Sequence, residues 1–288
     1  MLDQIKSARR FAAAPPRDRH RHADAANENF PVASLLLAKS VRRHVVAFYN
    51  FVRAADNVAD DPKRREDDKL AALARFAEGL NGRATEPSEA LALASSAAET
   101  GVGIEEAHAL LDAFRQDAVK TRYADHGKLV DYCRRSADPV GRYLLRLHGE
   151  SETAFPASDA LCTSLQILNH IQDGQADYRT LDRVYLPLDL LDRHGAEVDA
   201  LGDSASGPSM RAAFDELLHT VGADLERADA LPGQIRSRRL RMEAGAILAN
   251  ARALHRLLLR HDPLAGRVAQ SRPAKLATAL RGALGAWR

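Results

Sequence analysis

Cysteine is scarce in this chain. Only Cys133 and Cys162 occur among its 288 residues, and they lie far apart in the sequence. Two such cysteines cannot form the disulfide framework of a small secreted protein, and their separation does not match a metal-binding motif. The N-terminus also lacks the order of charged, apolar and small residues that marks a signal peptide. We therefore expect a protein of the reducing cytoplasm, with both thiols in packing roles.

Aromatic residues and long apolar runs are also few. Aromatic residues account for 5% of the chain, and Ala and Leu outnumber Val and Ile, so the composition favours helices over strands. No apolar run approaches the roughly 18 to 20 residues that a membrane-spanning helix requires. Apolar residues still amount to 45% and charged residues to 28%, as in folded globular domains. The composition predicts an all-α globular protein.

Neither sign of charge dominates. The chain has 41 basic and 39 acidic residues, which gives a formal net charge of +2. The two kinds alternate along predicted helices such as residues 63–78, so nothing in the sequence indicates a nucleic-acid partner. Most of the basic residues are arginine, whose planar group of donors suits phosphate. The charge pattern is therefore compatible with a small anionic ligand.

The chain divides into an arm and one domain. Residues 1–28 are polar and contain Pro15-Pro16, which predicts a loose N-terminal arm. Residues 29–288 show helical periodicity between Gly and Pro breaks, which predicts a single helical domain. The predicted helical segments cover residues 32–60, 66–80, 87–99, 104–122, 126–150, 156–177, 187–194, 208–228, 233–261 and 273–286.

Two of these segments carry matching polar stripes. In the first, the members lie at positions i, i+4, i+7 and i+11, on one face of a helix: Tyr49, Arg53, Asp56 and Asp60. In the second, they lie at positions i, i+3, i+7 and i+11: Gln166, Asn169, Asp173 and Asp177. Apolar residues surround both stripes. Both are therefore expected to face the interior, where carboxylates are costly unless compensated.

Each stripe contains an Asp-x-x-x-Asp pair. One such pair alone is usually a solvated helix surface. Two matched pairs on facing helices would place four carboxylates around a gap, and like charges in that position repel unless a cation joins them. Magnesium bridged to a diphosphate prefers such oxygen ligands. The pattern therefore favours a magnesium-dependent site for a diphosphate substrate.

The residues around the two stripes resemble those of a known family. The stretches "RRHVVAFYNFVRAADNVAD" (42–60) and "LQILNHIQDGQADYRTLDRVYLP" (165–187) are similar to the two aspartate-rich motifs of the squalene and phytoene synthases, which join prenyl diphosphates head to head. The resemblance spans residues 27–280. It implies an isoprenoid-synthase-type helical bundle with a central active-site cavity, formed by a single domain.

The resemblance also implies roles for individual residues. Four aspartates would hold magnesium: Asp56, Asp60, Asp173 and Asp177. Other positions would contact the diphosphate, the metal cluster or the prenyl chain: Asn29, Arg53, Tyr132, Gln166, Asn169, Arg183, Tyr185 and Arg272. Tyr49 belongs to the first motif and is included among the catalytic candidates. The chain departs from many members in having Gln172, where they carry arginine, and Asn29, where they carry serine.

Three segments point to one branch of the family. "ENFPVAS", "YCRRSADPVG" and "NHIQD" resemble the bacterial branch of hopanoid biosynthesis, which converts presqualene diphosphate to hydroxysqualene. That reaction ends with water, whereas a squalene synthase needs a nicotinamide as hydride donor. The glycine cluster Gly101-Val102-Gly103 follows no predicted strand and does not form a dinucleotide-binding motif. The resemblance further implies a prenyl diphosphate substrate, handed over by a presqualene diphosphate synthase.

Two other functions stay open. The first is condensation of two prenyl diphosphates to presqualene diphosphate, phytoene, dehydrosqualene or squalene. The second is a non-catalytic scaffold, although such a homologue would be expected to lose its aspartates. Eleven histidines show no zinc-like spacing, and we expect packing or surface roles for them, with His170 the one beside the second stripe.

The C-terminal segment carries an apolar stripe. Its members recur at helical spacing: Leu276, Leu280, Leu284 and Trp287. Basic residues flank them: Arg272, Lys275, Arg281 and Arg288. Such a helix either rests on an anionic membrane, here the inner face of the cytoplasmic membrane, or packs as a last helix on the core.

Overall fold

The computed structural model describes residues 39–287. The predicted N-terminal arm, residues 1–28, and the candidate Asn29 lie outside the described residues. Within residues 39–287 every element is helical, and the one β-type contact is an isolated bridge between Arg122 and Val184. The all-α prediction is confirmed. None of the helices in this part of the chain is both long and apolar enough to cross a membrane.

The α-helices follow one another with short connections. Their bounds are α2 Lys39–Ala59, α3 Glu66–Leu80, α4 Ser88–Thr100, α5 Ile104–Val119, α6 His126–Ser136, α7 Asp138–Leu147, α8 Phe155–Leu181, α9 Leu188–His194, α10 Pro208–Ala228, α11 Leu231–Gln234, α12 Arg238–Leu258 and α13 Arg272–Gly285. Two 3₁₀ turns, Glu152–Ala154 and Val198–Gly202, complete the described elements.

Local sequence signals explain where several helices begin and end. The side chains of Asp125 and Ser271 accept hydrogen bonds from backbone N–H groups in the first turns of α6 and α13. Gly101 and Gly195 end α4 and α9 in the left-handed conformation that glycine adopts without strain. Most predicted segments therefore match observed helices within a few residues.

One predicted segment is wrong in its continuity. Residues 126–150 form two helices, α6 and α7, which break at Ala137. Pro139 lies in the first turn of α7, where it cannot donate a backbone hydrogen bond back into α6. Similarly, the predicted segment 233–261 resolves into the end of the short α11 and the long α12. The apolar periodicity alone did not reveal either break.

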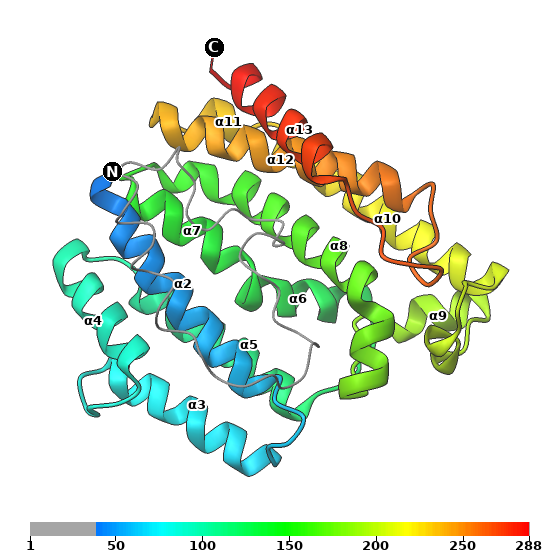
Figure 1. The fold of residues 1–288 in the computed structure, drawn as a ribbon, viewed down its shortest axis with the longest axis horizontal. Helices are drawn as coiled ribbons and strands as arrows, with labels where there is room; N and C mark the ends of the chain where they lie inside the picture. Colours follow the sequence, from blue (N-terminus) through cyan, green and yellow to red (C-terminus); the bar gives the residue numbers. More distant parts are fainter. Residues whose placement is uncertain (1–38, 288) are drawn as a thin grey trace, which may run out of the picture. The chain divides into compact units, whose positions relative to one another are not determined.

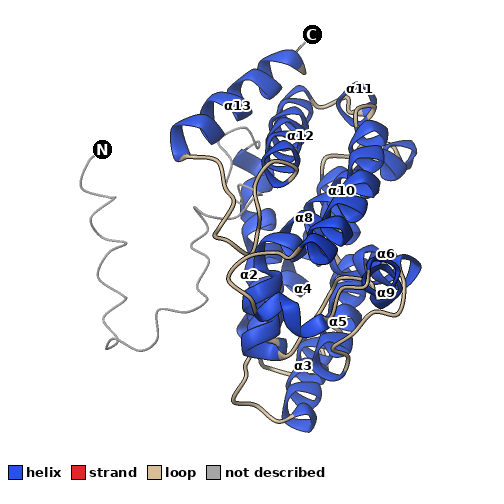
Figure 2. Cartoon of the chain, turned by 90° about the vertical axis from the view of Figure 1, so that its right-hand side faces the viewer, coloured by secondary structure: helices blue, strands red, loops and turns tan. Residues whose placement is uncertain are grey.

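Helix α8 runs through the middle of the described helices (Figure 1). It packs against α6 and α7 on one side and against α10 and α12 on another. Helices α2 to α5 form a second group, which joins the first through the contacts of α5 with α6 and α7. Helix α13 lies on the outer side of α12 (Figure 2). The two helices that carry the polar stripes, α2 and α8, thus belong to two packed layers.

The apolar face of α2 fixes the direction of its polar stripe. Phe48, Phe51 and Ala55 are buried, and the ring of Phe48 stacks on Tyr143 of α7 with centroids 3.9 Å apart. The Tyr143 hydroxyl donates a 2.9 Å hydrogen bond to the backbone oxygen of His44. Burial of such side chains is worth about 1.5–3 kcal/mol each. Packing on α7 therefore fixes the orientation of α2 about its own axis, so that its polar face points away from this contact.

Candidate active site

The first aspartate pair lies on the polar face of α2. Arg53 Nη1 donates a 3.0 Å hydrogen bond to Asp56 Oδ2. Although 32% of the Asp56 side chain is accessible, loss of hydration and, secondly, the charge of Asp60 raise its pKa to about 7, against the opposing effect of Arg53. Two neighbouring carboxylates thus share an excess of negative charge, which a cation would relieve.

Arg183 ties this pair to the rest of the site. It follows α8, and its side chain is buried, with 5% of its surface accessible. Its Nη1 atom donates to Asp60 Oδ1 at 2.8 Å and to the Tyr185 hydroxyl at 3.1 Å, while Nη2 donates to the backbone oxygen of Asp117 at 2.8 Å. A buried guanidinium with several acceptors is held in one orientation. Arg183 therefore fixes the position of Asp60 from the far end of α8.

Asp117 forms the centre of a buried tyrosine cluster. The Tyr132 hydroxyl donates to its Oδ2 at 2.6 Å, and the Tyr185 hydroxyl donates to its Oδ1 at 3.1 Å. Burial raises the pKa of Asp117 to about 6, while Arg183 and the two hydroxyls act in the opposite direction. Burial also raises the pKa of both tyrosines well above the usual value. Both phenols are therefore protonated hydrogen-bond donors.

The second aspartate pair lies on α8 in a more open position. Half of the Asp173 side chain is accessible, and Arg267 Nη1 lies 3.8 Å from its Oδ1. Asp177 is one turn further on, and its backbone oxygen accepts a 3.2 Å hydrogen bond from the Arg183 N–H. Gln166 and Asn169, on the preceding turns, are half-buried. Asp173 is therefore more exposed than Asp56 and Asp60, and it also lies beside an arginine.

The structure thus brings together six of the predicted residues through the contacts described above. Arg53, Asp56, Asp60, Arg183, Tyr185 and Tyr132 form one connected network. Tyr49 lies one turn before Arg53 on α2. Arg272 begins α13, where it is exposed.

The basic side chain that lies beside the α8 pair is Arg267, which the sequence reasoning did not single out. The side-chain amide of Gln172 donates to the backbone oxygen of Val268 and so connects α8 to the loop that carries Arg267. Gln172, the departure noted in the sequence, thus connects α8 to the segment that contains Arg267.

The aspartates of α2 and α8 offer oxygen donors of the kind that magnesium binds. Within residues 39–287, no three or more side chains of His, Cys, Asp or Glu are grouped closely enough to hold one metal ion. Magnesium, however, is usually bound by one or two carboxylates together with substrate phosphates, and it keeps several waters. The oxygen-only donors of α2, with the raised pKa of Asp56, fit such a cation. The residues are therefore suited to a metal that arrives with a diphosphate.

Two buried residues that were not among the predicted site residues lie in this network: Asp117, and His170, for which the sequence favoured a packing or surface role. Asp117 follows Leu110, Ala113 and Phe114 at helical spacing, so it falls on the buried face of α5. A carboxylate in an apolar stripe could have marked it. His170 precedes Asp173 by one turn of α8 and is buried, and its ring stacks on Tyr185 with centroids 3.5 Å apart.

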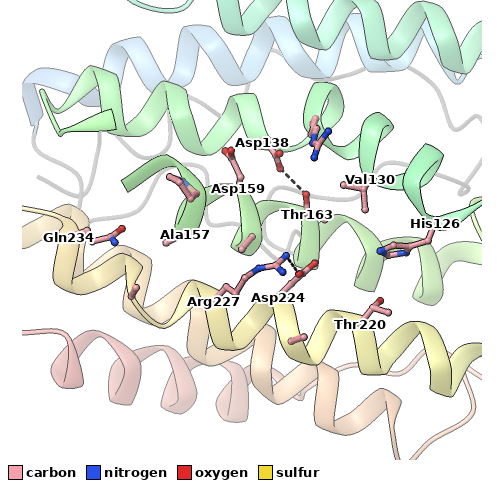
Figure 3. Close-up of a pocket in the computed structure, with 15 residues that line it drawn as sticks. His126, Val130, Asp138, Ala157, Asp159, Thr163, Thr220, Asp224, Arg227 and Gln234 are labelled. Carbon is pink, nitrogen blue, oxygen red and sulfur yellow. Dashed lines mark hydrogen bonds and ion pairs between the residues drawn. The ribbon is translucent and has the colours of Figure 1, made fainter. Parts of the chain in front are cut away.

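A separate cavity of about 650 Å³ lies among α6, α8 and α10 (Figure 3). Its lining includes Asp138, which accepts a hydrogen bond from Thr163, and Asp224, which pairs with Arg227. None of the predicted site residues lines it. The cavity is therefore distinct from the network around Asp60 and Asp117.

Comparison with known proteins places the site in a family. The Squalene/phytoene synthase model matches residues 23–275. A hydroxysqualene synthase of Rhodopseudomonas palustris is 43% identical over 90% of this chain and 88% of that protein. One of Zymomonas mobilis is 36% identical over 98% and 94%. A presqualene diphosphate synthase of Rhodopseudomonas palustris is less similar, 29% identical over 75% of each chain.

A solved structure of a similar enzyme has the same fold as this chain. The squalene synthase HpnC from Alicyclobacillus acidocaldarius is 29% identical and superimposes with a TM-score of 0.71, which covers 80% of this chain and 87% of that one. The family model spans both aspartate motifs and the tyrosine cluster between them. The chain belongs to the squalene/phytoene synthase family.

Proposed function

We propose that this protein is a hydroxysqualene synthase, which converts presqualene diphosphate and water to hydroxysqualene and diphosphate. The observation that carries the proposal is the difference in sequence identity to two proteins of one organism. The chain is much more similar to the hydroxysqualene synthase of Rhodopseudomonas palustris than to its presqualene diphosphate synthase. Both aspartate pairs are present, so a scaffold that has lost its chemistry is disfavoured.

The reaction begins with loss of the diphosphate. The C–O bond to the diphosphate breaks, and its electron pair leaves with the oxygen. Asp56, Asp60, Asp173 and Asp177 would hold Mg²⁺, which when bound supplies positive charge to the departing diphosphate. Arg53 lies on the same helix face and adds a fixed cation there, while Arg183 holds Asp60 in place. The two helices would thus each contribute two carboxylates to the binding of one anion through its metal.

The carbocation that remains must be protected from random bases. The cyclopropylcarbinyl cation rearranges to an allylic cation before one water molecule attacks. The buried tyrosines of the cluster keep their protons, because their pKa values are raised, and so do not quench the cation as phenolates. Apolar side chains of α8 such as Ile167 and Ile171 exclude bulk water. Release of a proton from the added water completes the alcohol.

The decisive experiment separates the two branches of the family by substrate. Purified protein is incubated with Mg²⁺ and either presqualene diphosphate or farnesyl diphosphate, without a nicotinamide, and the lipids are identified by mass spectrometry. Hydroxysqualene from presqualene diphosphate is the expected result. A hydrocarbon or presqualene diphosphate from farnesyl diphosphate would instead assign the condensing reaction. The variant Asp173→Asn and a chelator serve as controls for the metal site.

We further propose that α13 rests on an anionic membrane from the cytoplasmic side. Gly245 and Gly282 bring α12 and α13 into backbone contact, so α13 is docked on the core. Its leucine stripe nevertheless remains exposed, with 62% of Leu276 and 64% of Leu284 accessible. From residue 263 onward the sequence has basic residues and no Asp or Glu. An exposed apolar stripe on a purely basic segment suits an anionic lipid surface, from which a prenyl substrate made by a presqualene diphosphate synthase would reach the site.

Vesicle co-sedimentation tests this surface. The triple variant Leu276→Ser, Leu280→Ser and Leu284→Ser should lose most binding to vesicles that contain phosphatidylglycerol. The matched control is Val119→Ser with Leu259→Ser, which removes exposed apolar side chains elsewhere. Binding of the triple variant at the level of the control would overturn the membrane role.

A further inference from the structure

His170 is a buried histidine in the centre of the candidate site. It lies on α8, and the turn that follows it carries Asp173. Its ring stacks on Tyr185 at 3.5 Å with an interplanar angle of 14°, and it lies 5.9 Å from the ring of Tyr132. Both tyrosines donate to Asp117. The imidazole is thus held in a fixed orientation by the two tyrosine rings, which connect it to Asp117 of α5.

Among residues 39–287, the Nε2 atom of this imidazole has no hydrogen-bond partner. It is buried, and no described residue donates to it or accepts from it. A buried polar atom left in this state costs about 1–3 kcal/mol. In native proteins, such an atom usually binds a water molecule or has a catalytic role. The geometry therefore provides a hydrogen-bonding position at Nε2 that no described residue occupies.

The other polar groups around the imidazole are already engaged. The hydroxyls of Tyr132 and Tyr185 donate to Asp117, and the hydroxyl of Tyr123 accepts from the Gln116 side chain at 3.1 Å. Burial, with a smaller effect of Arg183, lowers the pKa of His170 to about 3, so the imidazole is neutral. In the tautomer that carries its proton on Nδ1, Nε2 presents a lone pair. Nε2 can therefore accept a hydrogen bond from a bound molecule, whereas the other polar groups of this cluster already have described partners.

We propose that His170 Nε2 binds the water molecule that captures the allylic cation and accepts its proton. This inference rests on the proposed function, and it adds the residue that ends the reaction. A lone pair of the water oxygen forms the new C–O bond, which leaves the oxygen positively charged. The proton then moves to Nε2, and the neutral alcohol and a histidinium result. Histidinium returns the proton to solvent after the product leaves.

The weak basicity of this histidine suits the step. A protonated alcohol is a far stronger acid than a histidinium, so even an imidazole of lowered pKa accepts its proton. A more basic group would be protonated before the water arrives and could not orient it through a lone pair. A base placed against the cation itself would remove a proton from carbon and give a hydrocarbon. Water held at Nε2 favours the alcohol instead.

Product partition tests the role of His170. The variant His170→Phe keeps a ring against Tyr185 and removes the nitrogen, and His170→Gln restores a polar group near the position of Nε2. With presqualene diphosphate and Mg²⁺, the phenylalanine variant should still release diphosphate, but the alcohol share of its products should fall by at least about tenfold in favour of hydrocarbons. The glutamine variant should recover most of the alcohol. Thermal unfolding of each variant checks the fold, and His170→Leu replaces the phenylalanine variant if that one is unfolded.

Two results would overturn the proposal, and they are distinguishable. If the wild-type enzyme forms hydroxysqualene and a folded apolar variant keeps the same alcohol share, the role of His170 is refuted while the proposed function stands. If the wild-type enzyme forms no alcohol from presqualene diphosphate, the proposed function and the role of His170 fail together. Loss of diphosphate release and alcohol in equal proportion would also refute a role confined to water capture.

Discussion

The two aspartate pairs have the same spacing but different surroundings. Asp56 and Asp60 on α2 are paired with Arg53 and Arg183, and Arg183 is in turn bound to Asp117. Asp173 on α8 is half-exposed, and the guanidinium of Arg267 lies 3.8 Å from its carboxylate. One pair is part of a buried network, whereas the other lies at its open edge. We therefore expect the α2 pair to stabilise the fold as well as to act in the site, and the α8 pair to act on the ligand.

Substitution of one aspartate in each pair should reveal this difference. Asp60→Asn and Asp173→Asn should each lower kcat/KM by about 10³-fold. Each substitution removes a carboxylate that would bind the metal, and the metal would stabilise the departing diphosphate. Only Asp60→Asn should also lower the free energy of unfolding, by about 1–3 kcal/mol, because the amide still offers Arg183 an oxygen but lacks the charge that pairs with the buried guanidinium. Steady-state kinetics and urea unfolding measure both quantities. Equal unfolding energies for the two variants would contradict the comparison.

Removal of the central arginine should have the largest effect on stability. Arg183→Met leaves Asp117 and Asp60 without their buried cation, and loss of one partner from a buried pair costs about 3–5 kcal/mol. The midpoint of chemical unfolding should fall accordingly. The control is Arg193→Met, which removes an exposed arginine of α9 whose ion pairs lie in water. If both variants unfold at the same denaturant concentration, the network around Asp117 contributes no stability.

A buried carboxylate outside the site should make stability depend on pH. Burial and, secondly, the charge of Asp159 raise the pKa of Asp138 to about 7, while Thr163, Arg142 and Arg134 act in the opposite direction. Because the folded pKa lies above the unfolded one, the folded state binds the proton more tightly, and stability falls as pH rises from about 4 to about 7.

Asp138→Asn tests this effect. The amide oxygen can still accept the hydrogen bond from Thr163, and the variant carries no charge to bury. The difference in unfolding free energy between variant and wild type should shift by about 2–4 kcal/mol in favour of the variant between pH 4.5 and pH 8. Thermal unfolding across this range provides the measurement. A difference independent of pH would show that Asp138 titrates normally.

The sequence predicted the helices and both stripes, because each depends on spacing within one segment. The contacts of the site depend on segments that lie far apart in the chain. Asp117 reaches Tyr132 and Tyr185 only through the packing of α5 on α6 and the loop after α8. No local pattern distinguishes His170 from a packing histidine. What distinguishes it is its Nε2 atom, which has no hydrogen-bond partner among residues 39–287, and the stacking of its ring on Tyr185.

The smallest expected effect concerns the open edge of the site. Gln172 occupies a position where arginine is common in the family, and its amide holds the backbone of Val268, one residue after Arg267. The loop thereby brings the Arg267 guanidinium to Asp173. We predict that Arg267 supplies the cation that position 172 lacks, as an exposed contact to the anionic substrate.

Arg267→Met should accordingly raise KM by about two- to fivefold and change the unfolding free energy by less than about 0.5 kcal/mol, because an exposed ion pair is worth little to the fold. Gln172→Ala should raise KM in the same direction, since the loop that carries Arg267 loses its hydrogen bond to α8. The double variant should be no worse than Arg267→Met alone, because both changes act through one guanidinium. Additive increases in KM would mean that Gln172 contacts the substrate itself, and the α8 edge would then contain two independent diphosphate contacts in place of one.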